Sequence, residues 1–396
     1  MKRLLFFLLL AGSLVSPAVN AQVSCSQSSK LICLIPQGLN FTQSSFASLG
    51  FLSEAVGSEV SSLPLASPAS GIIYENDPKL NLPVPSDETL GPVLTQRPET
   101  IGRHKLYIAA TYQFFRFEDI DGLSLKNLPI FITVPGQGFE PTNNRLDLTV
   151  HQTTGYLTFG LTSRVDVSVA VPVLDINEQL TTSGVEYNLT SSIIQPISSR
   201  SVSGSAVGIG DVILAAKGTL WKPKHGGLAF GTEVRLPSGD AMNFLGSGTI
   251  GVKPFLSWTY GGRFAPHANI SYEMNGESVL ATNAAGKNGH LPNRLFYSGG
   301  ADVRVTKWMT IAADALSQRV FDSERVALTS VLQTNQNVSY PSLVVSSSSY
   351  NRTDGSIGAK FKPFRNLIIT GNLLVKLDQG GLRARTVPLG ALSYTF

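Results

Sequence analysis

The chain of 396 residues contains little charge, few cysteines and, beyond its first 21 residues, no long hydrophobic run. Asp, Glu, Lys and Arg make up 15% of it, whereas ordinary soluble domains contain about 25%. The net charge is only +4, and the basic residues form no continuous tract. A typical nucleic-acid-binding surface is therefore excluded. No later stretch approaches the roughly 18 apolar residues that a membrane-spanning helix needs. If this chain enters a membrane, it must do so as strands.

The sequence contains only two cysteines, Cys25 and Cys33, and they lie close together. No histidine is near them, and two thiolates do not complete a tetrahedral zinc site, so no metal is expected. In a chain exported to an oxidising compartment such a pair predicts a disulfide. No cofactor is expected either, because Gly208 and Gly210 lack the third glycine and the helix of a dinucleotide site.

The first residues have the three parts of a secretory signal peptide. The basic pair Lys2 and Arg3 precedes an apolar stretch that extends to Val15, and a small-residue cleavage site ends at Ala21. We therefore expect residues 1–21 to be removed on export.

The last residues alternate in polarity and stop on an aromatic side chain. Leu392, Tyr394 and Phe396 share one face of this segment. The final strand of an outer-membrane β-barrel has this pattern, because one face of it meets lipid. We expect these three residues to be the membrane-insertion signal through which the barrel-assembly machinery binds the last strand.

Between these ends, alternating apolar and polar residues predict strands. Twelve such segments follow one another, at about residues 105–117, 145–161, 165–180, 210–221, 228–237, 249–260, 264–273, 293–305, 308–321, 353–361, 367–377 and 384–396.

The connections between these segments alternate in length. Short links follow the even-numbered segments, and long links follow most of the odd-numbered ones, at 118–144, 181–209, 238–248, 274–292 and 322–352. Tight periplasmic turns and long outer loops alternate in this way in outer-membrane barrels. The sequence thus predicts an all-β fold, an antiparallel transmembrane β-barrel of about 12 strands over residues 103–396, surrounded by lipid of a bacterial outer membrane.

Charged residues lie on the face opposite to the apolar one. A charge at the lipid midplane costs about 2–4 kcal/mol, so the polar face is predicted to line the lumen. These side chains either pair with one another or line a substrate path. The candidates are Asp147, His151, Asp166, Asp211, Lys217, Glu233, Arg235, Lys253, His267, Asp302, Arg304, Asp314, Lys360 and Lys376.

Three positions predict local irregularity in the strands. The apolar phase changes between Val150 and Leu157, which predicts a bulge near Gly155. Pro172 and Pro254 lie within predicted strands, where a proline cannot donate to the ladder.

Residues 22–102 form an irregular N-terminal segment, in which Ser, Pro and Leu mix without sustained periodicity. Two arrangements fit this composition. The segment enters the lumen from the periplasmic side as a plug, or it remains a loose periplasmic leader.

No catalytic residues are predicted. The chain contains neither a Gly-x-Ser-x-Gly elbow nor a His-Glu-x-x-His motif. Two other functions stay open. An outer-membrane lipid hydrolase would need His151 or His267 beside a serine and an acid, and a structural or adhesive barrel would use the loops 181–209 and 322–352.

Three short stretches, at residues 99–122, 156–172 and 208–248, resemble the meta-pathway phenol-degradation family of outer-membrane proteins. Examples are Gly160-Leu161-Thr162-Ser163-Arg164 and Leu236-Pro237-Ser238-Gly239-Asp240. The resemblance implies a barrel akin to the long-chain fatty acid channels, with passive uptake of small hydrophobic or aromatic compounds. The long N-terminal segment and the two cysteines have no counterpart in that pattern.

Overall fold

The structure is a computed structural model. It describes residues 25, 29–39, 46–67, 74–77, 82–85, 89–134, 138–188, 193–223, 226–282, 288–333, 337–364 and 366–396. The predicted signal peptide at 1–21 lies outside the described residues.

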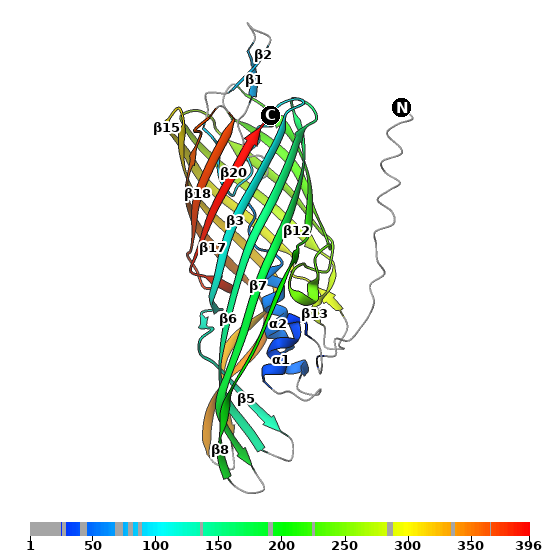
Figure 1. Cartoon of the computed structure of the whole chain (residues 1–396), viewed down its shortest axis with the longest axis vertical. Helices are drawn as coiled ribbons and strands as arrows, with labels where there is room; N and C mark the ends of the chain where they lie inside the picture. The colour runs from blue at the N-terminus through cyan, green and yellow to red at the C-terminus, as the bar shows by residue number, and fades with distance from the viewer. Residues whose placement is uncertain are drawn as a thin grey trace, which may run out of the picture.

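Twelve antiparallel strands form a closed ring (Figure 1). The ring closes because β3 pairs with β20 on one side and with β6 on the other. Each of the twelve predicted segments coincides with one ring strand, which confirms the all-β barrel. The strands are β3 (Leu106–Ile120), β6 (Gly138–Gly160), β7 (Val165–Asn188), β9 (Val212–Trp221), β10 (Gly227–Leu236), β11 (Gly251–Thr259), β12 (Phe264–Asn275), β15 (Arg294–Thr306), β16 (Met309–Gln333), β17 (Val338–Phe361), β18 (Leu367–Lys376) and β20 (Thr386–Thr395).

Much of the predicted long loops is strand. β7 continues past the ring to pair with β8 (Ile193–Ile209), and β6 pairs with β5 (Leu128–Val134). β16 and β17 stay paired as far as Gln333 and Val338. β5 and β8 project beyond one end of the barrel (Figure 1). Shorter strands are β1 (Tyr74–Asp77), β2 (Leu82–Pro85), β4 (Leu123–Ser124), β13 (Glu277–Thr282), β14 (Asn288–His290) and β19 (Leu382–Ala384).

The N-terminal segment contains the helices η2 (Leu31–Cys33), α1 (Leu34–Gly38) and α2 (Phe46–Val60), and η3 (Ala241–Asn243) lies in a connection of the barrel. α1 and α2 lie at the end of the barrel from which β5 and β8 project (Figure 1). α1 contacts β7 and β8, and α2 contacts β13. Among the described residues, no helix is both long and apolar enough to cross a membrane.

The first helices fit closely against the wall. A Cβ atom on Gly38 would lie 2.6 Å from Cδ2 of Leu180 on β7, so a glycine permits this approach. Along α2, Leu52, Val56 and Val60 recur every four residues and are buried. The spacing places them on one face of the helix, and they join the wall residues in one apolar cluster.

The outer surface of the ring is apolar. Large hydrophobic side chains on neighbouring strands point outward, as Phe230, Leu256 and Ile270 illustrate. Trp221, Trp258, Tyr260 and Trp308 are exposed near strand ends.

The bulge predicted near Gly155 is wrong. β6 pairs without a register shift with β3 from Phe159 to Leu148 and with β7 across the same residues. Inward residues remain in phase, with apolar side chains from Leu146 to Val150 and mostly polar ones from Gln152 onward. The apparent phase change is thus a change in the chemistry of one continuous inward face.

Both prolines mark an interruption in pairing, as expected. At Pro172, β7 stops pairing with β9 and begins to pair with β8. The ladder between β11 and β12 leaves out residues 253 and 254. A proline is tolerated at such points because no ladder donor is needed.

Candidate functional site

The stretch 89–101 of the N-terminal segment lies inside the ring, where buried lysines hold its backbone. Lys217 Nζ on β9 donates to the carbonyls of Arg97 (2.8 Å) and Glu99 (2.7 Å). Thr219 on the same strand donates to the Pro98 carbonyl at 2.7 Å. An extended backbone has no ladder partner for these carbonyls, so the wall supplies the donors.

A second lysine holds the same stretch from β17. Lys360 Nζ donates to the carbonyls of Leu90 (3.1 Å) and Pro92 (2.6 Å). On β7, Asp166 accepts a 3.0 Å hydrogen bond from the Ile101 backbone. Strands that are well separated around the ring therefore bind one short stretch of chain.

His267 lies buried between two acids. Its Nε2 is 2.5 Å from Asp314 Oδ1, and its Nδ1 is 3.8 Å from Asp302 Oδ2 and 3.3 Å from the Ala265 carbonyl oxygen. Thr89 of the N-terminal segment contacts Asp302 at 3.4 Å. Carboxylate and backbone oxygens thus face both ring nitrogens, an arrangement unlike that of a serine hydrolase, in which one nitrogen faces a serine hydroxyl.

At the end of α2, Glu59 forms a buried ion pair with the wall. Its carboxylate lies 2.6 Å from Arg352 Nη1 and accepts a hydrogen bond from the Tyr350 hydroxyl. Arg294 donates to the Ser58 carbonyl at 3.1 Å. Burial acts to raise the pKa of Glu59, but the guanidinium groups of Arg352 and Arg294 outweigh it and hold the pKa below its ordinary value.

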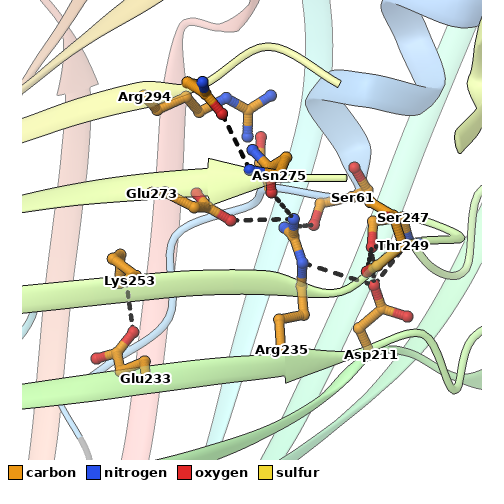
Figure 2. A network of polar contacts seen from close by, with 12 residues as sticks. Ser61, Asp211, Glu233, Arg235, Ser247, Thr249, Lys253, Glu273, Asn275 and Arg294 are labelled. Carbon is orange, nitrogen blue, oxygen red and sulfur yellow. Dashed lines mark hydrogen bonds and ion pairs between the residues drawn. The ribbon is translucent and has the colours of Figure 1, made fainter. Parts of the chain in front are cut away.

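A network of charges continues along the neighbouring wall (Figure 2). Arg235 contacts Glu273 at 3.0 Å, Asn275 at 2.5 Å and Asp211 at 3.8 Å. It also approaches the Ser61 carbonyl at 3.4 Å. Every charge in this group has an opposite charge beside it.

Further contacts complete the network. Lys253 pairs with Glu233 at 2.5 Å (Figure 2). Asp211 accepts from the Ser247 backbone at 2.7 Å and from the Gly239 backbone at 3.1 Å. Asp211 therefore also fixes the connection 238–248 to the wall.

Of the remaining predicted residues, Arg304 and Lys376 lie on the inward phase, and Lys376 pairs with Asp119. Asp147 and His151 do not face the lumen, contrary to the sequence prediction. Both lie on the outward face of β6, where Asp147 pairs with Arg145 at 2.7 Å. His151 Nδ1 lies 2.7 Å from the Tyr112 hydroxyl. Because a bulge was predicted near Gly155, the prediction exchanged the inward and outward faces of this part of β6.

The same error concealed Gln152 and Tyr156, which face inward. Glu59 was missed because its buried partners Tyr350 and Arg352 lie far from it in the sequence. Arg352 was missed because it falls one residue before its predicted strand.

A cavity of about 280 Å³ lies inside the ring, between the N-terminal segment and the wall. Residues 60–67 and 94–96 form one side of it. The wall side includes the rings of Tyr156, Phe255 and Phe296 and the charge network of Figure 2. Within the described ranges, no group of three His, Cys, Asp or Glu residues is placed to hold a metal ion.

The two cysteines and the last strand are also described. Cys25 and Cys33 form a disulfide with a Cα–Cα distance of 5.1 Å. Leu392, Tyr394 and Phe396 point outward from the last strand, and the rings of Tyr394 and Phe396 lie 4.6 Å apart.

Comparison with known proteins agrees with the sequence resemblance. The model of the family described as "Putative MetA-pathway of phenol degradation" matches residues 142–312, which is less than half of the chain. The match confirms the resemblance to this family. None of the curated proteins matches the chain.

Several solved outer-membrane proteins align with most of the chain. The COG4313 outer membrane channel from Pseudomonas putida F1 is 12% identical, over 76% of this chain and 98% of that one, with a TM-score of 0.45. A FadL homologue from Pseudomonas aeruginosa is 11% identical over 83% and 96%, with a TM-score of 0.34. The toluene transporter TodX from Pseudomonas putida is 10% identical over 83% and 95%, with a TM-score of 0.28.

Proposed function

We propose that this chain, similar over residues 142–312 to the phenol-degradation family, is a bacterial outer-membrane channel for small hydrophobic or aromatic compounds. In this proposal the solute passes without an energy source, and the N-terminal segment is a plug within the lumen. The observation that carries it is the cavity enclosed by the ring beside the N-terminal segment.

The two faces of the ring support a place in the membrane. Its outer face carries exposed apolar side chains, whereas charged side chains such as Lys217, Arg235 and Lys360 are buried inside. Lipid favours this distribution and water does not. Outer-membrane lipids would then surround the ring, and the barrel-assembly machinery would bind the last strand through Leu392, Tyr394 and Phe396.

The chain path supports a plug that spans the barrel. α1 and α2 lie at the end with the long hairpins, whereas β3 begins at the opposite end (Figure 1). Just before β3, the His104 backbone donates to the Gly160 carbonyl at 2.7 Å. With short turns in the periplasm, the helices would lie at the outer end of the channel.

The nature of the cargo is supported by the family and by the cavity. The family description refers to phenol degradation, and apolar and aromatic side chains line much of the cavity. Ligand pockets of proteins combine an apolar lining with a few polar groups in this way.

Solute flux into liposomes tests the channel. The refolded full chain would be compared with a chain lacking residues 22–100, using an aromatic compound, a fatty acid and a sugar. We expect selective passage of the aromatic compound through the full chain and less selective passage without the segment. Absence of flux in both forms would contradict the channel and direct attention to binding partners of the long hairpins.

A further inference from the structure

We infer that the cavity binds one small, neutral aromatic molecule carrying a hydroxyl or similar group, and that the N-terminal segment forms one wall of this site. The inference rests on the proposed function for the arrival of the ligand. It goes further because the N-terminal segment then contacts the bound molecule, in addition to obstructing the lumen.

The size of the cavity limits the ligand to one or two rings. An engineered cavity of roughly 150 Å³ is large enough for benzene. The present cavity of about 280 Å³ is less than twice that size. A long acyl chain or a sugar oligomer would exceed it.

The lining favours an aromatic ring. Phe255 is 4% exposed and Tyr156 is 4% exposed, so both rings are fixed by their surroundings. Phe296 lies opposite the Lys253 ammonium, 5.3 Å from its ring centroid. Fixed rings of this kind pack favourably against a further ring in offset or edge-to-face geometry.

The charges around the cavity favour a neutral ligand. Arg235 is paired with Glu273, and Lys253 is paired with Glu233. Arg352 is paired with Glu59 of the N-terminal segment. An ionised ligand would have to displace one of these partners and leave a buried charge unpaired, which is costly.

Two polar side chains on the cavity wall are incompletely hydrogen-bonded. Gln152 is 3% exposed, and its Oε1 accepts no hydrogen bond from any residue that the structure describes. On the same criterion, Nδ2 of Asn269 makes none, while its Oδ1 accepts from the Gln96 backbone at 3.1 Å. A hydroxyl group both donates and accepts, so it can bind either side chain.

The N-terminal segment completes the site. Gln96 lies on the cavity and donates to Glu233 at 3.2 Å, while Ser67 binds Gln96 at 3.3 Å. Leu94, from the same stretch, also lines the cavity. Without these residues the wall groups would face an open lumen.

Equilibrium dialysis of the detergent-solubilised full chain tests the site, with 1-naphthol as the probe. Naphthalene, which lacks the hydroxyl, and naphthalene-1-sulfonate, which is charged, serve for comparison. We expect saturable binding of one 1-naphthol per chain, several-fold weaker binding of naphthalene and no saturable binding of the sulfonate.

A matched pair of variants separates the cavity from non-specific uptake. Ala215 lines the cavity, whereas Ala216, the next residue of β9, points outward. Ala215→Phe should weaken 1-naphthol binding at least tenfold by filling the cavity, and Ala216→Phe should leave it unchanged. Equal binding by both variants, or no saturable binding by the native chain, would overturn the inference.

A second pair tests the hydrogen bond without filling the cavity. Gln152→Leu retains the side-chain size and should weaken 1-naphthol binding several-fold while leaving naphthalene unaffected. Thr153→Leu on the outward face is its control. Equal losses for both probes would contradict a role for the amide.

Flux without saturable binding overturns this site but not the channel, and binding without flux overturns the channel but not the site.

Discussion

The two ends of the barrel interior differ in chemistry along the same strands. On β6, Leu146, Leu148 and Val150 face inward near the N-terminal helices, and all are at most 1% exposed. Further along the strand, Gln152 and Thr154 occupy the same face. The change occurs without any shift in strand register.

The difference follows the part of the N-terminal segment that each end meets. α2 has satisfied its own backbone groups, so it offers the wall apolar side chains such as Leu52 and Val56. The extended stretch 89–101 offers bare carbonyls, and Lys217 and Lys360 bind them. The side chains that line this barrel therefore match the part of the N-terminal segment that they contact. An inward-facing residue can be apolar where it meets a helix.

The largest effect is expected where the apolar end contains its buried ion pair. Glu59→Gln takes the 2.6 Å partner away from the buried Arg352 guanidinium, which keeps Asp354, at 3.6 Å, as its remaining ion-pair partner. Removal of one partner from such a pair typically costs about 3–5 kcal/mol. We expect α2 to detach more readily, which hydrogen exchange of its backbone amides would measure. Glu277→Gln is the control, because this carboxylate is exposed. Unchanged exchange in Glu59→Gln would show that the pair does not hold the helix.

The apolar packing itself should contribute nearly as much. Leu52 on α2 is 1% exposed within the cluster that includes Leu148. Leu52→Ala should cost about 2–5 kcal/mol, since it removes buried methyl groups and leaves a cavity. The same exchange experiment measures it. Leu328→Ala, at a site 56% exposed, should have little effect. Similar losses for both substitutions would mean that α2 is not packed as described.

Much of the barrel could be predicted from the sequence, because the outward face of most ring strands is apolar at alternate residues. Leu228, Phe230 and Val234 on β10 show the pattern that predicted the strand. The extensions were taken for loops, since stretches such as 199–205 and 346–349 are rich in serine and have no apolar face. Their strands form through pairing with a ring strand, which periodicity does not reveal.

The candidate site was only partly predictable. A charged residue opposite an apolar face was correctly placed inside at Lys217 and Arg235, among others. The partners could not be predicted, because Glu59 and Arg352 are far apart in sequence. On β6 the predicted orientation was wrong, because the inward face is apolar where it meets the helices and therefore resembles a lipid-facing surface.

Acid should loosen the apolar end. The pKa of Glu59 is held below its ordinary value of about 4.3 by the neighbouring cations. The ionised pair therefore stabilises the docked helix fully above that value, and its contribution falls as the pH drops through the lowered pKa, by at most about 1.4 kcal/mol per pH unit. Exchange of α2 should be constant from pH 7 to about 5, after correction for the intrinsic rate, and should rise below about 4. In Glu59→Gln this acid step should be absent, and a step of equal size would assign it to other groups.

The smallest effect on helix docking and on solute selectivity is expected for the two residues that were wrongly predicted to face the lumen. Asp147 and His151 lie on the outward face of β6, and neither contacts the N-terminal segment among the described residues. Asp147→Asn and His151→Gln should therefore leave α2 exchange and the solute selectivity of the channel unchanged. Asp166→Asn is the matched inward substitution, since it weakens the bond to the Ile101 backbone and the attraction to Lys217. It should increase exchange at residues 97–101. Asp147→Asn and Asp166→Asn could instead change the solute selectivity equally. The Asp147 side chain would then reach the solute path, and the alternation of residues along β6 would not separate the interior from the outer face.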